Sequence, residues 1–357
     1  MGGSGAASVI VVGAGVFGLA TGLALAEAGF RVRLVAETVP GRTASGVAAG
    51  MLAPAFESVL DRPATDSLRL LCASRDLWPG LAGRLGVALD RSGAAAVGPD
   101  AWLQDLQAQL EALGLEVRDA GRAEMQTWTP GLAPRFRRAL VTPEDWRIEP
   151  QDALAAMASR LKDLGGTMEA GALSDRNLAD SPGPVVLATG ADRRLSALAP
   201  ELALLSPIKG QILWRADPAP PSRVIRTPGA YLLGSGGGLL AGATMEAGRA
   251  DLAADLKAQA SLRGALAGVI PGLPPEGWET RVGVRAASPD GLPLAGASVR
   301  PGVFLAVGAR RNGWLLAPLV AEIVTAAVTG EDRGRWAPRL DPARFAPGQG
   351  RFRHERV

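Results

Sequence analysis

Three glycines near the start of the chain have a spacing that suits dinucleotide binding. Gly13, Gly15 and Gly18 form the pattern G-x-G-x-x-G, with Val16 and Phe17 between the last two. The first glycine allows a tight turn, the second lets backbone N–H groups approach a pyrophosphate, and the third lets a helix pack closely on a strand. We therefore expect these five residues to hold the pyrophosphate of a dinucleotide.

The ribose of such a cofactor is usually bound by an acidic residue at the end of the following strand. Glu37 lies at about the right distance, but alignment on the apolar strand puts Ala36 where the acid normally stands. Either Glu37 binds the ribose from a register shifted by one residue, or other donors replace it.

The next segment distinguishes between nicotinamide and flavin cofactors. Residues Arg42 to Pro54 read Arg-Thr-Ala-Ser-Gly-Val-Ala-Ala-Gly-Met-Leu-Ala-Pro, which is unusually rich in small side chains. Small side chains let the backbone approach a flat ring system closely. This composition favours a flavin.

Several other kinds of chemistry are disfavoured by the residues available. The chain has one cysteine, Cys72, and one histidine, His354, which lies in an arginine-rich tail. An internal disulfide is excluded, and neither a zinc-type ligand cluster nor a nucleophile with a histidine base is expected. We expect His354 to be a solvated tail residue.

The bulk composition is that of an ordinary globular enzyme. The 38 basic and 35 acidic residues give a net charge of +3, and 47% of residues are hydrophobic. Nucleic acid is therefore not an expected partner. No uncharged apolar stretch reaches the roughly 20 residues that a membrane span needs, so we expect no membrane insertion and a cytoplasmic location.

The glycine pattern lies inside a predicted strand, turn, helix and strand. We expect strands at Ser8–Val12 and Arg31–Val35 and a helix from Leu19 to Gly29, which together make a parallel pair with the glycine turn at the carboxyl end of the first strand. Residues 185–190 and 303–307 read as further buried parallel strands. Residues 152–164 and 315–328 read as core helices.

This order predicts a discontinuous nucleotide domain. The predicted fold class is α/β, with a Rossmann-type FAD-binding domain of the glutathione-reductase type and an interleaved α+β substrate domain built on an antiparallel sheet. We expect the FAD-binding domain to comprise residues 8–80, 146–205 and 285–345, the substrate domain residues 81–145 and 206–284, and the tail residues 346–357.

Beyond these patterns, the chain resembles the D-amino acid oxidase superfamily, and within it most closely the glycine oxidases of thiamine biosynthesis. The likeness starts in the segment 42–54, where that family carries a near-identical R-T-x-S-x-A-A-G-M-L stretch. It continues, in the family's order, through 207–211 (PIKGQ), 242–245 (GATM), 283–285 (GVR), 290–293 (DGLP) and 311–318 (RNGWLLAP).

The resemblance implies roles for individual residues. Arg285 matches the arginine that pairs with the substrate carboxylate, and Arg311 matches one beside the flavin and substrate. Tyr231 matches a pocket tyrosine, and Met245 a residue that shapes the substrate cavity. Further FAD contacts are implied for Arg42, Thr43, Ser45, Ala49, Gly50, Met51, Gly190, Asn312, Gly313, Trp314 and Leu315.

The activity implied is oxidation of a small amino acid such as glycine, sarcosine or a small D-amino acid. Non-covalent FAD would accept the electrons and dioxygen would reoxidise it, which gives hydrogen peroxide and an imino acid that hydrolyses to the oxo acid; no protein base is required. Thiamine biosynthesis is the metabolic setting that the resemblance suggests. Gly229 and Ala309 stand where some relatives have histidine, so the pocket can differ in width or polarity.

Three questions stay open at this point. The electron acceptor could instead be a quinone or carrier, which would make the chain a D-amino acid or secondary-amine dehydrogenase. The chain could also be a non-catalytic FAD-binding subunit of an amine-oxidising complex. The resemblance leaves a homo-oligomer open as well.

Overall fold

The computed structural model describes residues 7–61 and 67–346. Its first sheet has six strands in the order β17-β18-β10-β1-β2-β9, and all neighbours are parallel except the β17–β18 pair. The strands are β1 (Ser8–Val12), β2 (Arg31–Ala36), β9 (Thr167–Ala170), β10 (Val185–Leu187), β17 (Leu294–Ala297) and β18 (Val303–Val307). Central β1 and β10 consist mainly of valine, isoleucine and leucine because both faces of a parallel sheet are covered.

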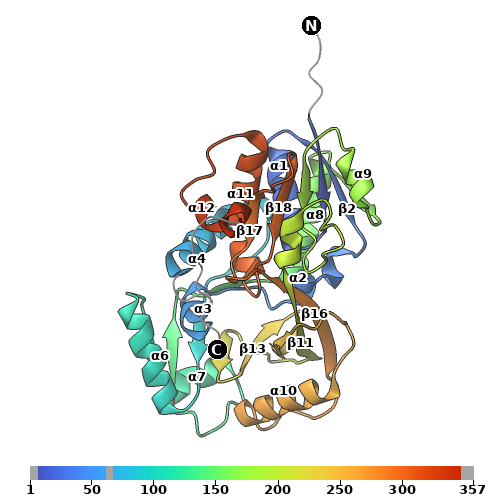
Figure 1. Ribbon diagram of the computed structural model, residues 1–357. Helices are drawn as coiled ribbons and strands as arrows, with labels where there is room; N and C mark the ends of the chain where they lie inside the picture. Colours follow the sequence, from blue (N-terminus) through green and yellow to red (C-terminus); the bar gives the residue numbers. More distant parts are fainter. Residues whose placement is uncertain (1–6, 62–66, 347–357) are drawn as a thin grey trace.

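Three helices form much of the core around this sheet (Figure 1). They are α1 (Val16–Glu27), α8 (Pro150–Asp163) and α11 (Gly313–Thr329). α1 packs against both of the others. α1 and α11 are apolar on almost every side, as expected for buried helices, whereas α8 buries one stripe that includes Leu154, Met157 and Leu161.

The second sheet has nine strands in the order β15-β11-β14-β13-β12-β5-β7-β6, with β16 on the other side of β11. They are β5 (Ala94–Ala96), β6 (Arg118–Gly121), β7 (Arg138–Thr142), β11 (Ser206–Ala216), β12 (Val224–Thr227), β13 (Ala230–Ser235), β14 (Gly238–Gly242), β15 (Glu246–Ala247) and β16 (Glu279–Ala287). The sheet is antiparallel, as expected, apart from one pair, because β5 and β12 run parallel. The two strands are far apart in the chain, so no hairpin dictates their direction.

Different helices cover the two faces of this sheet. α10 (Leu256–Val269) and α7 (Arg122–Trp128) share one core cluster with Leu213 of β11. α6 (Asp100–Ala112) shares another with Ile212, the next residue along the same strand. Successive side chains of a strand point to opposite faces, so Ile212 marks one face and Leu213 the other.

A small third sheet, in the order β3-β8-β4, contains β3 (Met51–Leu52), β8 (Trp146–Ile148) and β4 (Leu89–Asp90). The remaining helices are α2 (Ala44–Val47), α3 (Pro54–Leu60), α4 (Leu68–Arg75), α5 (Trp78–Leu85), α9 (Asp175–Ala179) and α12 (Ala337–Leu340), and the 3₁₀ turns are η1 (Pro40–Arg42), η3 (Pro200–Leu204) and η4 (Pro342–Phe345).

Strand β16 links the two large sheets. It pairs with β11 from Ser206↔Ala287 to Trp214↔Glu279. At its end, Ala287 forms an isolated bridge with Ala309, and the N–H of Arg310 donates to the Ala286 carbonyl at 2.7 Å. Figure 1 shows β16 running from the upper, first-sheet half of the molecule into the lower half.

The strands expected at residues 8–12 and 303–307 have these bounds in the structure, and the strand expected over 185–190 ends at Leu187. Helix α1 begins at Val16, three residues before the apolar periodicity suggested, because the glycine turn leads straight into the helix. The division into two domains stays a prediction, and β16 crosses the proposed boundary between residues 284 and 285. Within the described residues, no helix is both long enough and apolar enough to cross a membrane. His354 lies outside the described residues.

Candidate active site

A cavity of about 370 Å³ is lined by segments from both halves of the molecule. Small residues of the segment Ala44–Met51 form one part of its wall. Gly210 and Ile212 of β11 form another, and the start of α11 a third. Arginines project into this space from separate elements, and their partners decide what the cavity can bind.

Arg285 differs in its partners from the two other arginines that line this cavity, Arg226 and Arg311. Its Nη1 donates to the Thr244 carbonyl at 3.2 Å and lies 3.3 Å from the Met245 sulfur. Among the described residues no carboxylate forms an ion pair with it, unlike Arg226, Arg310 and Arg311. Burial lowers the pKa of Arg285, but an arginine keeps its charge in proteins. A cation with unused donors facing a cavity suits an anionic group of a ligand.

Arg311 belongs to a buried charge cluster on the same cavity. Glu57 of α3, 4% exposed, accepts from Arg226 Nη2 at 2.9 Å and lies 2.9 Å from Arg311 Nε. Asp61 pairs with Arg310 and lies 4.0 Å from Arg311. Burial alone would raise the pKa of Glu57, but Arg311 and Arg226 outweigh burial and lower it. Glu57 is therefore a fixed anion and a poor proton acceptor.

Sequence reasoning missed Glu57 and Arg226. Both line the cavity, but they come from α3 and β12, which lie 169 residues apart in the chain. The available signal was a charge inside a run of β-branched residues, Val224-Ile225-Arg226-Thr227. Charged residues are rarely fully buried unless they are paired.

Asp145 is a third buried charged residue that was missed. Its two carboxylate oxygens accept from the N–H groups of Ala55 and Phe56, at 2.7 and 3.1 Å, in the first turn of α3. Burial raises the pKa of Asp145 to about 7. The residue therefore anchors the helix that carries Glu57. Ionisation of its carboxyl group lowers the stability of the fold, because a buried charge is removed from water.

The raised pKa of Asp145 predicts a pH-dependent stability. Because its folded-state pKa lies above the unfolded value, folding binds a proton, and the contribution of Asp145 is complete below that unfolded value and declines as pH rises towards 7. We expect the unfolding free energy of the wild type to fall relative to Asp145→Asn by about 1.4 kcal/mol per pH unit in this window. Urea unfolding of both proteins at about pH 5, 6 and 7 measures the difference. A pH-independent difference would contradict the prediction.

The two other residues expected in the substrate pocket also line the cavity. Tyr231 on β13 is 8% exposed, and burial raises its pKa, which keeps the phenol protonated. Met245 lies at the rim with 40% of its surface exposed. Arg285, Arg311, Tyr231 and Met245 thus meet around one cavity, although their catalytic roles stay predictions.

The glycine turn has the geometry that a pyrophosphate requires. A Cβ on Gly13 would lie 2.3 Å from the Ala188 carbonyl oxygen, and one on Gly18 would lie 1.9 Å from the Gly13 carbonyl oxygen. Gly15 caps α1 without a side chain, and the first turn of α1 has no acidic residue. The positive end of the helix is therefore left for a ligand anion, which fits the phosphates of a dinucleotide.

This close packing predicts that Gly18→Ala prevents cofactor binding. The added methyl group would collide with backbone of the turn itself, so the turn would have to shift. We expect at least a roughly hundredfold weaker affinity for FAD, because alanine would displace the turn that holds the phosphates. The ratio of flavin to protein absorbance after purification, and FAD titration of apoprotein, measure the effect. Gly83→Ala on α5 is the matched control, since a Cβ there meets nothing within 4 Å, and its cofactor content should equal that of the wild type.

The segment expected to contact a flavin is tied to the glycine turn. Ser45 Oγ accepts from the N–H of Val16 at 3.0 Å, and the Ser45 carbonyl accepts from Trp314 Nε1 at 3.0 Å. Thr43 caps α2 by accepting from the Gly46 N–H. Of the residues expected at the flavin, Ala49, Gly50, Met51, Asn312 and Trp314 line the cavity.

Other expected cofactor contacts lie elsewhere. Arg42 lines a separate cavity rather than the one that holds Arg285. Leu315 is fully buried in the core beside α1, and Gly313 opens α11. Gly190 follows β10 with a φ of +63°. Phe17 lies in the first turn of α1, 8% exposed. Their contacts with a cofactor remain predictions.

The ion pair of Glu37 bears on whether this residue can bind the ribose. Ala36 ends β2, and Glu37 follows it in an exposed ion pair with Arg194. A carboxylate that binds a ribose would have to share its oxygens with Arg194 or release it. The assignment of Glu37 or Ala36 to the ribose site stays a prediction.

Comparison with known proteins agrees with this geometry. A family profile described as "FAD dependent oxidoreductase" matches residues 8–327. The chain is 31% identical to a glycine oxidase of Pseudomonas aeruginosa, over 95% of this chain and 98% of the relative. It is 32% identical to a putative thiamine biosynthesis oxidoreductase ThiO of Rhizobium etli, over 88% and 94%.

A solved structure shows the same fold. The crystal structure of glycine oxidase from Geobacillus kaustophilus superimposes with a TM-score of 0.81 at 27% identity, over 94% of this chain and 98% of the other. The α/β fold class is thereby confirmed, and FAD is the cofactor of the family. On the matched residues, the glycine turn and the shared fold, the chain belongs to the FAD-dependent oxidoreductases of the D-amino acid oxidase type.

Proposed function

We propose that this protein oxidises a small amino acid, such as glycine, sarcosine or a small D-amino acid, with non-covalently bound FAD. The observation that carries the proposal is Arg285, a partly buried guanidinium that faces the cavity and has no carboxylate partner among the described residues. The substrate carboxylate supplies the missing charge. The glycine oxidase relatives support the choice of substrate class.

The chain's residues bind and orient the substrate rather than take its proton. Arg285 holds the carboxylate with two parallel charge-assisted bonds. Glu57 is fixed between two guanidinium groups, and Tyr231 keeps its proton, so the amine enters the reaction already neutral. Arg311 adds positive charge beside the reacting group, where it stabilises developing negative charge. FAD supplies the two-electron oxidation of the Cα–N bond to an imine.

The reaction balances with dioxygen and water as co-reactants. The amino acid loses two electrons and two protons to become the imino acid, and dioxygen gains them to become hydrogen peroxide. Water then converts the imino acid to the oxo acid and ammonia, or to the oxo acid and methylamine when sarcosine is the substrate. Dioxygen is the proposed acceptor, and the thiamine pathway is the proposed setting on the strength of the Rhizobium relative's name.

A substrate panel tests the proposal. The purified yellow protein is mixed with glycine, sarcosine, D-alanine and D-proline, and both flavin bleaching without oxygen and peroxide formation in air are recorded. We expect bleaching and peroxide with at least one of these amino acids. Bleaching without peroxide would keep the substrate class but replace dioxygen by another acceptor. A flavoprotein that no amino acid bleaches would overturn the proposal.

A further inference from the structure

A β-bulge lies beside Arg285. Gly242 of β14 pairs with Ile212 of β11, and Glu246 of β15 pairs with Lys209. Only Gly210 and Gln211 separate the pairing positions on β11, whereas the three residues Ala243–Met245 separate them on the other side, so this side has one residue more. Ala243 and Met245 line the cavity. Bulges of this kind re-aim side chains next to functional sites.

The bulge (Ala243–Met245) holds the guanidinium of Arg285. The carbonyl of Thr244 accepts from Arg285 Nη1 at 3.2 Å. The same nitrogen lies across Gly210, where a Cβ would be only 2.2 Å away. These contacts, and not a carboxylate, set the direction of Arg285. The orientation of the cation therefore depends on where the bulge places the Thr244 carbonyl.

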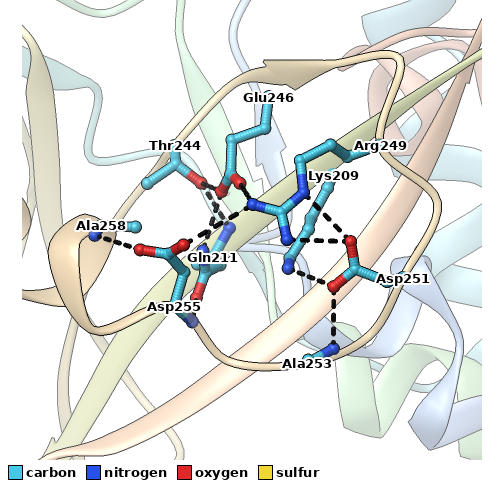
Figure 2. A network of polar contacts seen from close by, with 9 residues as sticks. All are labelled: Lys209, Gln211, Thr244, Glu246, Arg249, Asp251, Ala253, Asp255 and Ala258. Carbon is cyan, nitrogen blue, oxygen red and sulfur yellow. Dashed lines mark hydrogen bonds and ion pairs between the residues drawn. The ribbon is translucent and has the colours of Figure 1, made fainter.

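Polar side chains fasten the segment after the bulge on the opposite face of the sheet (Figure 2). Lys209 and Gln211 alternate with the cavity-lining Gly210 and are both 0% exposed. Lys209 Nζ pairs with Asp251 Oδ1 at 2.6 Å. Gln211 Nε2 donates to Glu246 Oε1 at 2.8 Å, and Gln211 Oε1 accepts from the next segment, at the N–H of residue 255, at 2.8 Å.

The network reaches the bulge through Thr244. The Gln211 N–H donates to Thr244 Oγ1 at 2.9 Å, and the Thr244 N–H donates to the Gln211 carbonyl at 3.1 Å. Thr244 Oγ1 in turn donates to Glu246 Oε1 at 3.0 Å. Arg249 closes the network by bridging Glu246 at 2.7 Å and Asp251 at 2.9 Å. Figure 2 shows the side chains of Thr244, Glu246 and Arg249 gathered around Lys209 and Gln211.

Complete burial of a lysine and a glutamine costs folding free energy, and apolar side chains could cover this face of the sheet without that cost. The neighbouring Leu213, on the same face, joins an apolar cluster instead. We propose that Lys209, Gln211, Glu246 and Asp251 are positioning residues for Arg285: they fix the bulge so that the Thr244 carbonyl holds the guanidinium ready for the substrate carboxylate. This inference rests on the proposed function, in which Arg285 binds that carboxylate.

The first test uses Glu246→Ala in the FAD-loaded enzyme. Glycolate, a carboxylate without an amine, is titrated while the flavin spectrum is recorded, and KM is compared with the limiting rate of flavin reduction. We expect the glycolate Kd and the KM to rise roughly tenfold, because the Arg285 guanidinium no longer points towards the carboxylate. The limiting rate of flavin reduction should stay within about twofold. Glu246→Gln should recover most of the affinity, since its amide oxygen can still accept from Thr244 and Gln211.

The control is Glu169→Ala, which removes an exposed ion pair to Arg33 on β9 and β2, at an edge of the other sheet. It should leave the glycolate Kd unchanged. Flavin content and melting temperature are recorded for each variant, and Lys209→Met provides a second, uncharged disruption of the network. Equal glycolate affinity in the wild type, Glu246→Ala and Lys209→Met would overturn the inference.

A double-variant comparison separates positioning from general loosening. In an Arg285→Lys background the ammonium still attracts a carboxylate but lacks the rigid fork, so adding Glu246→Ala should change the glycolate Kd by less than about twofold. A tenfold effect in both backgrounds would refute the positioning role. If Arg285→Ala itself leaves glycolate binding intact, the proposed function fails instead, which is a distinct outcome.

Discussion

Replacing Arg285 by alanine lowers kcat/KM for the amino acid substrate by about 10³-fold, because two charge-assisted bonds to the carboxylate are lost from a partly buried site. The loss is concentrated in KM and in carboxylate binding, since the carboxylate is bound in both the ground state and the transition state. Steady-state kinetics and glycolate titration measure the two effects. Flavin content should match that of the wild type, since we expect the pyrophosphate to bind at the glycine turn and not at Arg285.

The lysine variant sharpens this prediction. Arg285→Lys keeps the positive charge but loses the planar fork, so its kcat/KM should fall between those of the wild type and the alanine variant. A variant without Arg285 whose KM is unchanged would show that the carboxylate binds elsewhere. That result would remove the main support for an amino acid substrate.

The second large effect concerns stability. Glu57→Ala leaves Arg226, only 3% exposed, without its partner, and we expect it to lower the unfolding free energy by about 3–5 kcal/mol. Urea unfolding at pH 7 measures the loss. Because Arg311 also depends on Glu57, activity should fall in parallel even under conditions where the variant is folded.

The charge explanation has its own controls. Glu57→Ala combined with Arg226→Met removes both charges and should recover much of the lost stability, since no buried cation remains unpaired. Since the folded-state pKa of Glu57 is lowered, its stabilisation is present at neutral pH and disappears as pH falls through that lowered value. The gap between the wild type and Glu57→Ala should therefore narrow in acid. If the double variant is as unstable as Glu57→Ala alone, the stability loss comes from lost packing of the Glu57 side chain and not from an unpaired charge.

Local patterns predicted the first strand-helix-strand unit of the six-stranded sheet well, because its parts lie within some 30 residues of each other. The glycine turn, β1, α1 and β2 follow one another directly, so spacing alone identifies them. The second sheet was harder. The parallel pairing of β5 with β12 joins residues about 130 positions apart. No turn motif in the sequence predicts such a pairing.

The site shows the same limit. Arg285 and Arg311 stand in motifs that a family resemblance identifies, whereas Glu57, Asp145 and Arg226 gain their meaning only from one another. An acid on α3 is unremarkable until β12 brings an arginine to 2.9 Å from it. Likewise, nothing in the order Lys209-Gly210-Gln211 reveals that the glycine supports a guanidinium on one face while its neighbours fasten a bulge on the other.

The bridge between Ala287 and Ala309 has a consequence for how this enzyme can change. Arg285 stands two residues before that bridge and Arg311 two residues after it, so main-chain bonds set the spacing of the two cations. Gly229 lies in the turn between β12 and β13 and lines the same cavity. Substitutions in this turn change the space left for the substrate's side chain and leave the spacing of the two arginines unchanged. New substrate preferences are therefore easier to reach through this turn than through either arginine.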